Sequence, residues 1–333
     1  MSVVESHELP FSPRRIDACG LVPTRTVQTE RHYRATAQKL MRQSQPPLNA
    51  DDLARLSHTI AWVCGSHAMW STSTIRQYRA ALRLAIDDLE SAIEITPKES
   101  NMLRQRIEIG PTPRGSGARR QTSARKRRSL PMAEWERIIE SLAKSRTATG
   151  LLLGQLVKFN AFLGLRPMEL RDAYVVGRDL LARCAKATNG RAIAQVRELE
   201  LPGYTDDDIA DMAQFLEDFR RAADSAGCWQ RFHERLAKHL ERVCRRLGIA
   251  KVSLYTLRHC AIATAKNSHS AREVAAHAGQ KSEETAKRAY AKKSAGWVLP
   301  SPMVVPSVEI VARVKASPKS RFQPGQQLNR LSI

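Results

Sequence analysis

Apolar side chains recur along most of this chain at the spacing of amphipathic helices, which predicts a mainly helical protein. The pattern predicts four helices between residues 29 and 110, and Ile75, Leu82 and Leu89 lie on one face of the third. The fourth is shorter and runs from about Pro97 to Ile109. We expect residues 29–110 to form a small bundle of helices.

A second, mixed domain is expected from residue 130 to residue 297. It opens with a helix over 132–144, and the following helix around 152–163 is apolar nearly all round, which indicates burial. Gly164 can end that helix. Three short strands are then predicted near residues 174–176, 180–185 and 196–201.

The remaining elements of this domain follow from turn and cap residues. Asn189-Gly190 predicts a tight hairpin turn between the second and third strands. Two amphipathic helices come next, and Ser270 with Glu273 forms a capping box that begins a short helix. Ser282 is expected to open a last helix that carries Tyr290 about two turns in.

Proline, glycine and basic residues predict flexible segments around the two domains. Residues 1–28 are expected to form a flexible arm and residues 298–333 a flexible C-terminal tail. Residues 111–129 are rich in proline, glycine, serine and basic side chains, with no acidic ones, and predict a basic linker. As a flexible coil it would span roughly 23 Å, comparable to the diameter of a DNA duplex.

The charge of the chain favours a polyanionic partner. Fifty-four lysines and arginines against 33 aspartates and glutamates leave a net charge of +21. The longest apolar region, residues 151–165, is interrupted by polar side chains and too short to span a membrane. The first 20 residues lack a signal peptide's apolar core, so we expect a cytoplasmic protein. The six cysteines have no metal-binding spacing and are expected to be reduced and mostly buried.

Two groups of basic residues are candidate contacts to DNA phosphates. The third helix places Arg76, Arg79 and Arg83 along one edge that could follow a phosphate backbone. The linker adds a second group, which is Arg125, Lys126, Arg127 and Arg128. Solvated surface arginines and a passive linker are the alternatives.

An arginine that looks buried, Arg258 in the run 252–259, and a later tyrosine, Tyr290, suggest phosphodiester chemistry. An arginine matches phosphate oxygens with a planar fork of donors, so it can favour the transition state without a metal. A phenol has a pKa near ~10 in isolation, but neighbouring guanidinium charge favours the phenolate, which can attack phosphorus.

Four motifs in order resemble the tyrosine recombinases, or phage-type integrases. They are Gly164-Leu-Arg-Pro-Met-Glu-Leu170, the lysine of Ala185-Lys-Ala-Thr-Asn-Gly-Arg191, Tyr255-Thr-Leu-Arg-His259 and Tyr290. The resemblance implies a helical core-binding domain followed by an α+β catalytic domain, so the expected fold is mainly α with a small β-sheet.

The resemblance also implies roles for individual residues. Arg166 and Arg258 would clamp the scissile phosphate, Lys186 would protonate the departing 5′ oxygen, and Tyr290 would form a 3′-phosphotyrosine link. No metal or other cofactor is implied. The expected partner is double-stranded DNA. It would be bound in the nucleoid by a homo- or hetero-oligomer, with a tetramer expected on paired sites.

Two positions depart from the family pattern. Tyr255 stands where the family usually has histidine, and Gln280 stands where it has histidine or tryptophan. Neither side chain titrates near neutral pH. Both can still donate a hydrogen bond to a phosphate oxygen. His259 is interpreted as a packing residue, and His277 is a weaker candidate substitute. The alternative function is a DNA-binding accessory subunit with weak or no catalytic activity.

Overall fold

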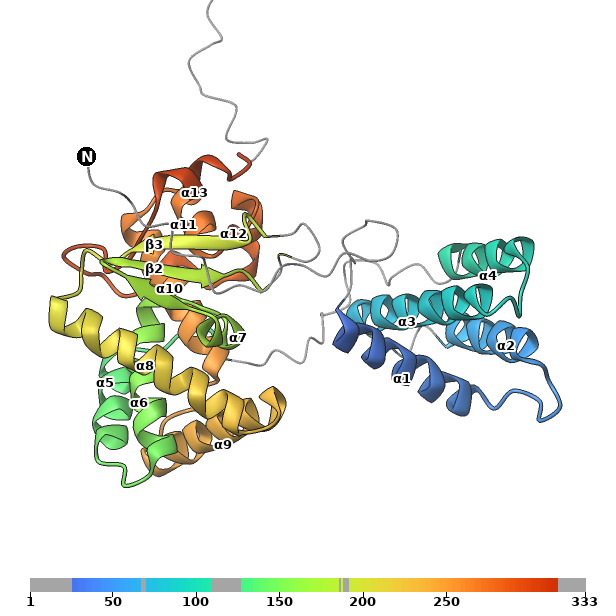
Figure 1. Cartoon of the computed structure of the whole chain (residues 1–333), viewed down its shortest axis with the longest axis horizontal. Coiled ribbons are helices and arrows are strands. Elements are labelled where there is room, and N and C mark those ends of the chain that lie inside the picture. The colour runs from blue at the N-terminus through green and yellow to red at the C-terminus, as the bar shows by residue number, and fades with distance from the viewer. Residues whose placement is uncertain (1–25, 67–69, 110–126, 186, 188–191, 317–333) are drawn as a thin grey trace, which may run out of the picture. The chain divides into compact units, whose positions relative to one another are not determined.

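The computed structural model describes residues 26–66, 70–109, 127–185, 187 and 192–316. The chain divides into two units, residues 1–125 and residues 126–333, which are described separately (Figure 1). The described residues are mostly helical, and they contain one four-stranded antiparallel sheet, which lies in the second unit. The expected fold class is confirmed.

The first unit consists of four helices, as the apolar pattern predicted. They are α1 (Val27–Ser44), α2 (Asp52–Gly65), α3 (Thr72–Ser91) and α4 (Pro97–Ile109). Side chains of Thr26, Asp51 and Ser71 accept hydrogen bonds from backbone amides and so cap the first three helices. Leu56 and Leu82 belong to its buried core. Burial of these apolar stripes holds the four helices together.

The second unit is built around helix α6. Its longer helices are α5 (Met132–Ala143), α6 (Ala148–Leu163), α8 (Asp206–Ser225), α9 (Trp229–Arg246) and α10 (Leu254–Ser268). Helix α6 contacts each of the other four. Most of its apolar side chains are buried, as predicted, although Leu151 is about half exposed at its beginning.

Shorter helices and the sheet complete this unit. The helices are α7 (Pro167–Arg171), α11 (Ala271–His277), α12 (Glu283–Ala289), the 3₁₀ turn η3 (Lys293–Ala295) and α13 (Val308–Ala312). The strands are β1 (Tyr174–Val176), β2 (Asp179–Arg183), β3 (Val196–Glu200) and β4 (Val305–Pro306), in that spatial order. Helix α8 contacts β1, and α11 contacts β3 and β4 (Figure 1).

The ladder between β2 and β3 ends where Arg183 pairs with Val196. Beyond that pair, the Cys184 amide donates to the Gln195 carbonyl at 2.8 Å. The tight turn expected at Asn189-Gly190 lies outside the described residues.

Part of the expected C-terminal tail is folded onto the second unit. Strand β4 pairs with β3, and Ile310 and Val314 are buried beside α11. The Arg272 guanidinium donates to the Val314 carbonyl at 3.3 Å. Proline breaks the apolar pattern here, so the sequence did not show these contacts. Residues 317–333 lie outside the described part.

Two further expectations concern membranes and thiols. No described helix is long and apolar enough to cross a membrane. The five cysteines within the described ranges form no disulfide, and three of them are buried, namely Cys184, Cys244 and Cys260. Cys228 is exposed, so burial is not general.

Candidate active site

The end of helix α6 positions the first candidate arginine. Gly164 ends α6 with φ +62°, a left-handed conformation that glycine adopts without strain. The Asn160 side chain then holds Leu165, because it accepts from the Leu165 amide at 2.8 Å and donates to its carbonyl at 3.0 Å. Arg166 follows as the N-cap of α7, with Pro167 as the first helical residue. Arg166 therefore lies at a rigid junction and points inward.

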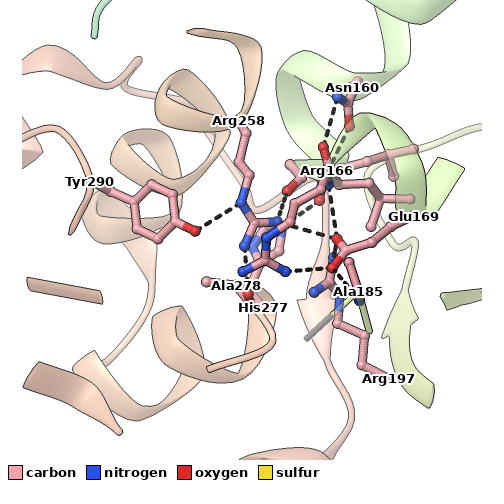
Figure 2. A network of polar contacts seen from close by, with 12 residues as sticks. Asn160, Arg166, Glu169, Ala185, Arg197, Arg258, His277, Ala278 and Tyr290 are labelled. Atoms are coloured by element: carbon pink, nitrogen blue, oxygen red, sulfur yellow. Dashed lines mark hydrogen bonds and ion pairs between the residues drawn. The ribbon is translucent and has the colours of Figure 1, made fainter. Parts of the chain in front are cut away.

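Arg258 lies at the centre of the site and is completely buried (Figure 2). Its Nη1 donates to the Gly164 carbonyl, and its Nη2 donates to the Ala278 carbonyl at 2.6 Å. Its Nε donates to the Tyr290 hydroxyl at 2.8 Å. The guanidinium thus joins the end of α6, the end of α11 and the residue after α12. Burial lowers its pKa, but an arginine remains protonated at neutral pH.

Glu169 on α7 joins the arginines of the site. Its carboxylate accepts from the Arg166 amide at 2.9 Å and from the Ala185 amide at 3.0 Å. It also accepts from Arg197 Nη2 at 2.8 Å and lies 3.5 Å from Arg258 Nη1. Burial alone would raise the pKa of Glu169, but the three arginines hold it far below its usual range. Glu169 is therefore ionised at neutral pH.

Tyr290 comes immediately after α12, in extended conformation, and not within a helix as the sequence suggested. Its side chain is only 4% exposed. Burial would raise the pKa of its phenol, but the charges of Arg258 and Arg166, together with Tyr255 and the hydrogen bond from Arg258, lower it overall. A buried phenol with a lowered pKa is suited to act as a nucleophile.

Tyr255 lies on α10 one turn before Arg258 and is 37% exposed. Burial and the neighbouring Tyr290 raise the pKa of its phenol, and Tyr255 in turn helps to lower the pKa of Tyr290. Tyr255 therefore stays protonated beside Tyr290 at neutral pH. His259 packs edge to face between them, with ring centroids 5.2 Å from Tyr255 and 5.5 Å from Tyr290. Burial and nearby positive charge lower the pKa of His259 to about 4.

Gln280 and His277 do not join this group by any described hydrogen bond. Gln280 is buried, and its side-chain Oε1 has no hydrogen-bond partner among the described residues. His277 lies 2.9 Å through Nε2 from the Leu163 carbonyl, so that nitrogen must carry a proton and donate it. Burial lowers the pKa of His277 to about 3. His277 is thus a neutral packing residue, which argues against its acting as the substitute.

The structure assigns importance to two residues that the sequence analysis did not select. The signal for Glu169 was its position three residues after Arg166, which places both on one side of a helical turn. The signal for Arg197 was its alternation with Leu199 and Leu201 along the strand, which placed it on the core face of β3. Lys186 lies outside the described residues, so its expected role stays a prediction.

Comparisons with known proteins found matches among solved structures only. No family model matches the chain, and no curated protein matches it. Solved structures of tyrosine recombinases are similar. A lambda integrase dimer bound to a COC' core site is 14% identical, with a TM-score of 0.46, covering 83% of this chain and 75% of that chain. A lambda integrase tetramer bound to a Holliday junction is also 14% identical, with a TM-score of 0.42, covering 83% of this chain and 75% of that chain.

XerA recombinase is 17% identical, with a TM-score of 0.37, covering 81% of this chain and 90% of that chain. Identities and TM-scores this low carry no argument about chemistry. The function proposed below is therefore argued from the side chains of this site.

The structure also bears on the candidate DNA contacts. On α3, Arg76 is exposed, whereas Arg83 forms an ion pair with Glu108 that neutralises part of its charge. Arg79 is half-buried, and its charge lowers the pKa of Cys64, which burial raises overall. The three arginines therefore differ in exposure, and their contact with DNA stays a prediction.

The basic linker ends earlier than expected. Arg127 pairs with Glu134 at 2.5 Å and donates to the Ala250 carbonyl at 3.3 Å, so it is attached to the second unit. Arg128 is exposed. Arg125 and Lys126 lie outside the described residues.

Proposed function

We propose that this protein cleaves and rejoins DNA strands, with Tyr290 as the nucleophile. One observation carries the proposal: the Tyr290 hydroxyl lies 2.8 Å from Nε of a completely buried arginine, Arg258, in a site with more positive than negative charge. Arginine favours charge on both the phenolate and a phosphate.

The reaction follows from this placement. The Tyr290 phenol gives up its proton to water and its oxygen attacks phosphorus, the bond from phosphorus to the 5′ oxygen breaks, and a 3′-phosphotyrosine diester forms. Arg166 and Arg258 hold the non-bridging oxygens, on which charge develops. The departing 5′ oxygen takes up a proton, for which Lys186 is the expected donor. Attack by a 5′ hydroxyl on the phosphotyrosine reverses these steps and releases Tyr290.

Tyr255 has a different role in this proposal from the one expected from sequence. Tyr255 helps to lower the pKa of Tyr290, so in this proposal it stabilises the nucleophile before DNA binds, and not the phosphate. A neutral donor at this position helps to keep charge on the phenolate oxygen.

The partner in this proposal is double-stranded DNA. The net charge of +21 supports binding to phosphates, and the exposed basic side chains include Arg76 in the first unit and Arg128 in the second. We propose that both units contact one duplex and that several copies assemble on paired sites. The similar lambda integrase structures are a dimer and a tetramer on DNA.

A second candidate is an accessory DNA-binding subunit with weak catalysis. The pKa values of His259 and His277, about 4 and about 3, favour this alternative. Neither imidazole can exchange a proton efficiently near neutrality, and losing such a group typically costs about 10² to 10⁴ in rate.

Covalent trapping tests the proposal and separates the candidates. The probe is a pool of nicked duplexes with randomised sequence, in which the short fragment beyond the nick diffuses away after cleavage. Wild-type protein should form an adduct that resists SDS, whereas Tyr290→Phe should form none and still bind duplex DNA. Binding without any wild-type adduct would favour the accessory subunit.

A further inference from the structure

Arg197 is a second arginine of this site that is completely buried. It lies on β3, and its Nη2 donates to Glu169 at 2.8 Å (Figure 2). Its Nη1 and Nε have no hydrogen-bond partner among the described residues. Burying a guanidinium costs free energy unless its charge and donors are compensated. One carboxylate shared with two other arginines compensates Arg197 only in part.

The chain is shaped around this guanidinium. Gly279 has φ +62°, and a Cβ atom there would lie 2.2 Å from Arg197 Nη1. The same Cβ would lie 3.3 Å from Cys184 Sγ. Only glycine leaves room for Arg197 between the end of α11 and the end of β2. The turn before Gln280 and the β3 arginine therefore fit one another.

The charges around Glu169 indicate what Arg197 contributes. Arg166, Arg197 and Arg258 all lie within ion-pair distance of the Glu169 carboxylate. Three positive charges and one negative charge leave a surplus of two. If Arg197 were neutral, Glu169 would cancel one charge of the two arginines that face Tyr290, and the surplus would fall to one.

We propose that Arg197 is a positioning residue for DNA cleavage: it balances Glu169 so that Arg166 and Arg258 keep their full charge for Tyr290 and the scissile phosphate. The inference rests on the function proposed above. It assigns no contact with DNA to Arg197, which acts only through Glu169. A purely structural Arg197 would affect stability but not the ionisation of Tyr290.

Titration of Tyr290 without DNA tests the electrostatic step. Tyrosine labelled with ¹³C reports phenol ionisation by NMR, and Tyr290→Phe identifies the signal. Besides Glu169, the groups that influence Tyr290 are Arg166 before α7 and Arg258, Tyr255, His259 and Lys266 on α10. Arg197→Met should raise the pKa of Tyr290 by about 0.5 to 1 unit, because the surplus positive charge falls.

A double variant and a matched control make the titration specific to the charge of Arg197. Arg197→Met combined with Glu169→Gln removes one charge of each sign and should return the pKa of Tyr290 close to the wild-type value. Arg220→Met is the control, because Arg220 on α8 donates to the Arg171 and Ala173 carbonyls at 3.2 and 3.0 Å, away from Tyr290. It should leave the pKa of Tyr290 unchanged.

Cleavage of a substrate recovered from the nicked pool gives a second readout. Arg197→Met should lower kcat about tenfold with little change in KM, and Arg197→Lys should recover much of the loss because it keeps the charge. The inference is overturned if folded Arg197→Met matches the Arg220→Met control in both the pKa of Tyr290 and kcat.

If Arg197→Met does not fold, the pKa of Tyr290 in Arg197→Lys and in the double variant tests the inference instead. A wild-type pKa of Tyr290 in both supports the inference, and a raised pKa in either contradicts it. If wild-type protein forms no adduct at all, the proposed function fails and the inference fails with it. If wild-type protein forms the adduct and the Arg197 variants behave like the control, only the inference fails.

Discussion

Two sets of three arginines, one in each unit of this protein, lie in different surroundings. The buried set is the half-buried Arg166 with the completely buried Arg197 and Arg258, and the set on α3 is the exposed Arg76 with the half-buried Arg79 and Arg83. The buried set shares Glu169 and holds three segments of the second unit together. On α3, by contrast, Arg83 has a carboxylate partner of its own and Arg76 is exposed to solvent.

This difference shows how the same side chain serves two purposes. A buried guanidinium keeps a strong field because little water screens it, so it can change the ionisation of Tyr290. A surface guanidinium is screened by salt and water, so it contributes mainly to affinity for a polyanion. Catalysis is therefore expected to depend on the buried set and DNA affinity on many surface charges.

Loss of the shared carboxylate should produce the largest effect. We expect Glu169→Gln to lower the free energy of unfolding by about 3 to 5 kcal/mol, because two buried guanidiniums and the half-buried one of Arg166 lose their common anion. Urea denaturation measures the change. Glu217→Gln on α8, which removes a half-exposed partner of Arg220, is the matched control and should have little effect. A loss under about 1 kcal/mol for Glu169→Gln would mean that the buried charges are solvated by other means.

The buried histidine beside this cluster should make the second unit sensitive to acid. The pKa of His277 is about 3 in the folded protein, against about 6.5 when unfolded, so between these values the unfolded chain binds more protons. Stability is therefore complete above pH ~6.5 and falls as the pH drops toward ~3, by on the order of 4 kcal/mol.

The variant His277→Gln tests this dependence. Glutamine can still donate to the Leu163 carbonyl but cannot take up a proton, so the acid loss of stability should become shallower. Denaturation midpoints measured from pH 7 to pH 4 report the slope. An unchanged slope would assign the acid sensitivity to other groups, of which His259, with a pKa of about 4, is the first candidate.

The surface set should show the smallest effects. Arg76→Gln should reduce the slope of log affinity against log salt by about one if Arg76 contacts a phosphate. Arg83→Gln should reduce it less, because Glu108 already neutralises part of that charge. Fluorescence anisotropy with a labelled duplex at several salt concentrations measures both slopes. Equal and unchanged slopes would remove α3 from the DNA interface.

The sequence predicted the helices and several features of the site. Apolar stripes located α3 and α6, Gly164 ended α6 as expected, and Arg258 was correctly expected to be buried. These features depend on contacts within one helix or on local caps, and local patterns record such contacts well.

The sequence did not reveal contacts that depend on long-range packing. Arg197 meets Glu169 only when the sheet lies against α7, and a strand pattern with one charged residue on its core face gave no partner for it. Tyr290 was expected within a helix, but α12 ends at Ala289 and places the phenol beside Arg258. The pairing of residues 305–306 with β3 and the packing of Ile310 and Val314 beside α11 were missed for the same reason.

Identification of the residue that becomes linked to DNA tests the central claim most directly. Two phenols lie together at this site, the buried Tyr290 and the more exposed Tyr255, and only the first contacts Arg258 by the described hydrogen bond. Wild-type protein trapped on nicked duplex is digested with trypsin and nuclease, and mass spectrometry locates the nucleotide on its peptide. We expect the nucleotide on Tyr290. A nucleotide on Tyr255, or on any other residue, would contradict the account.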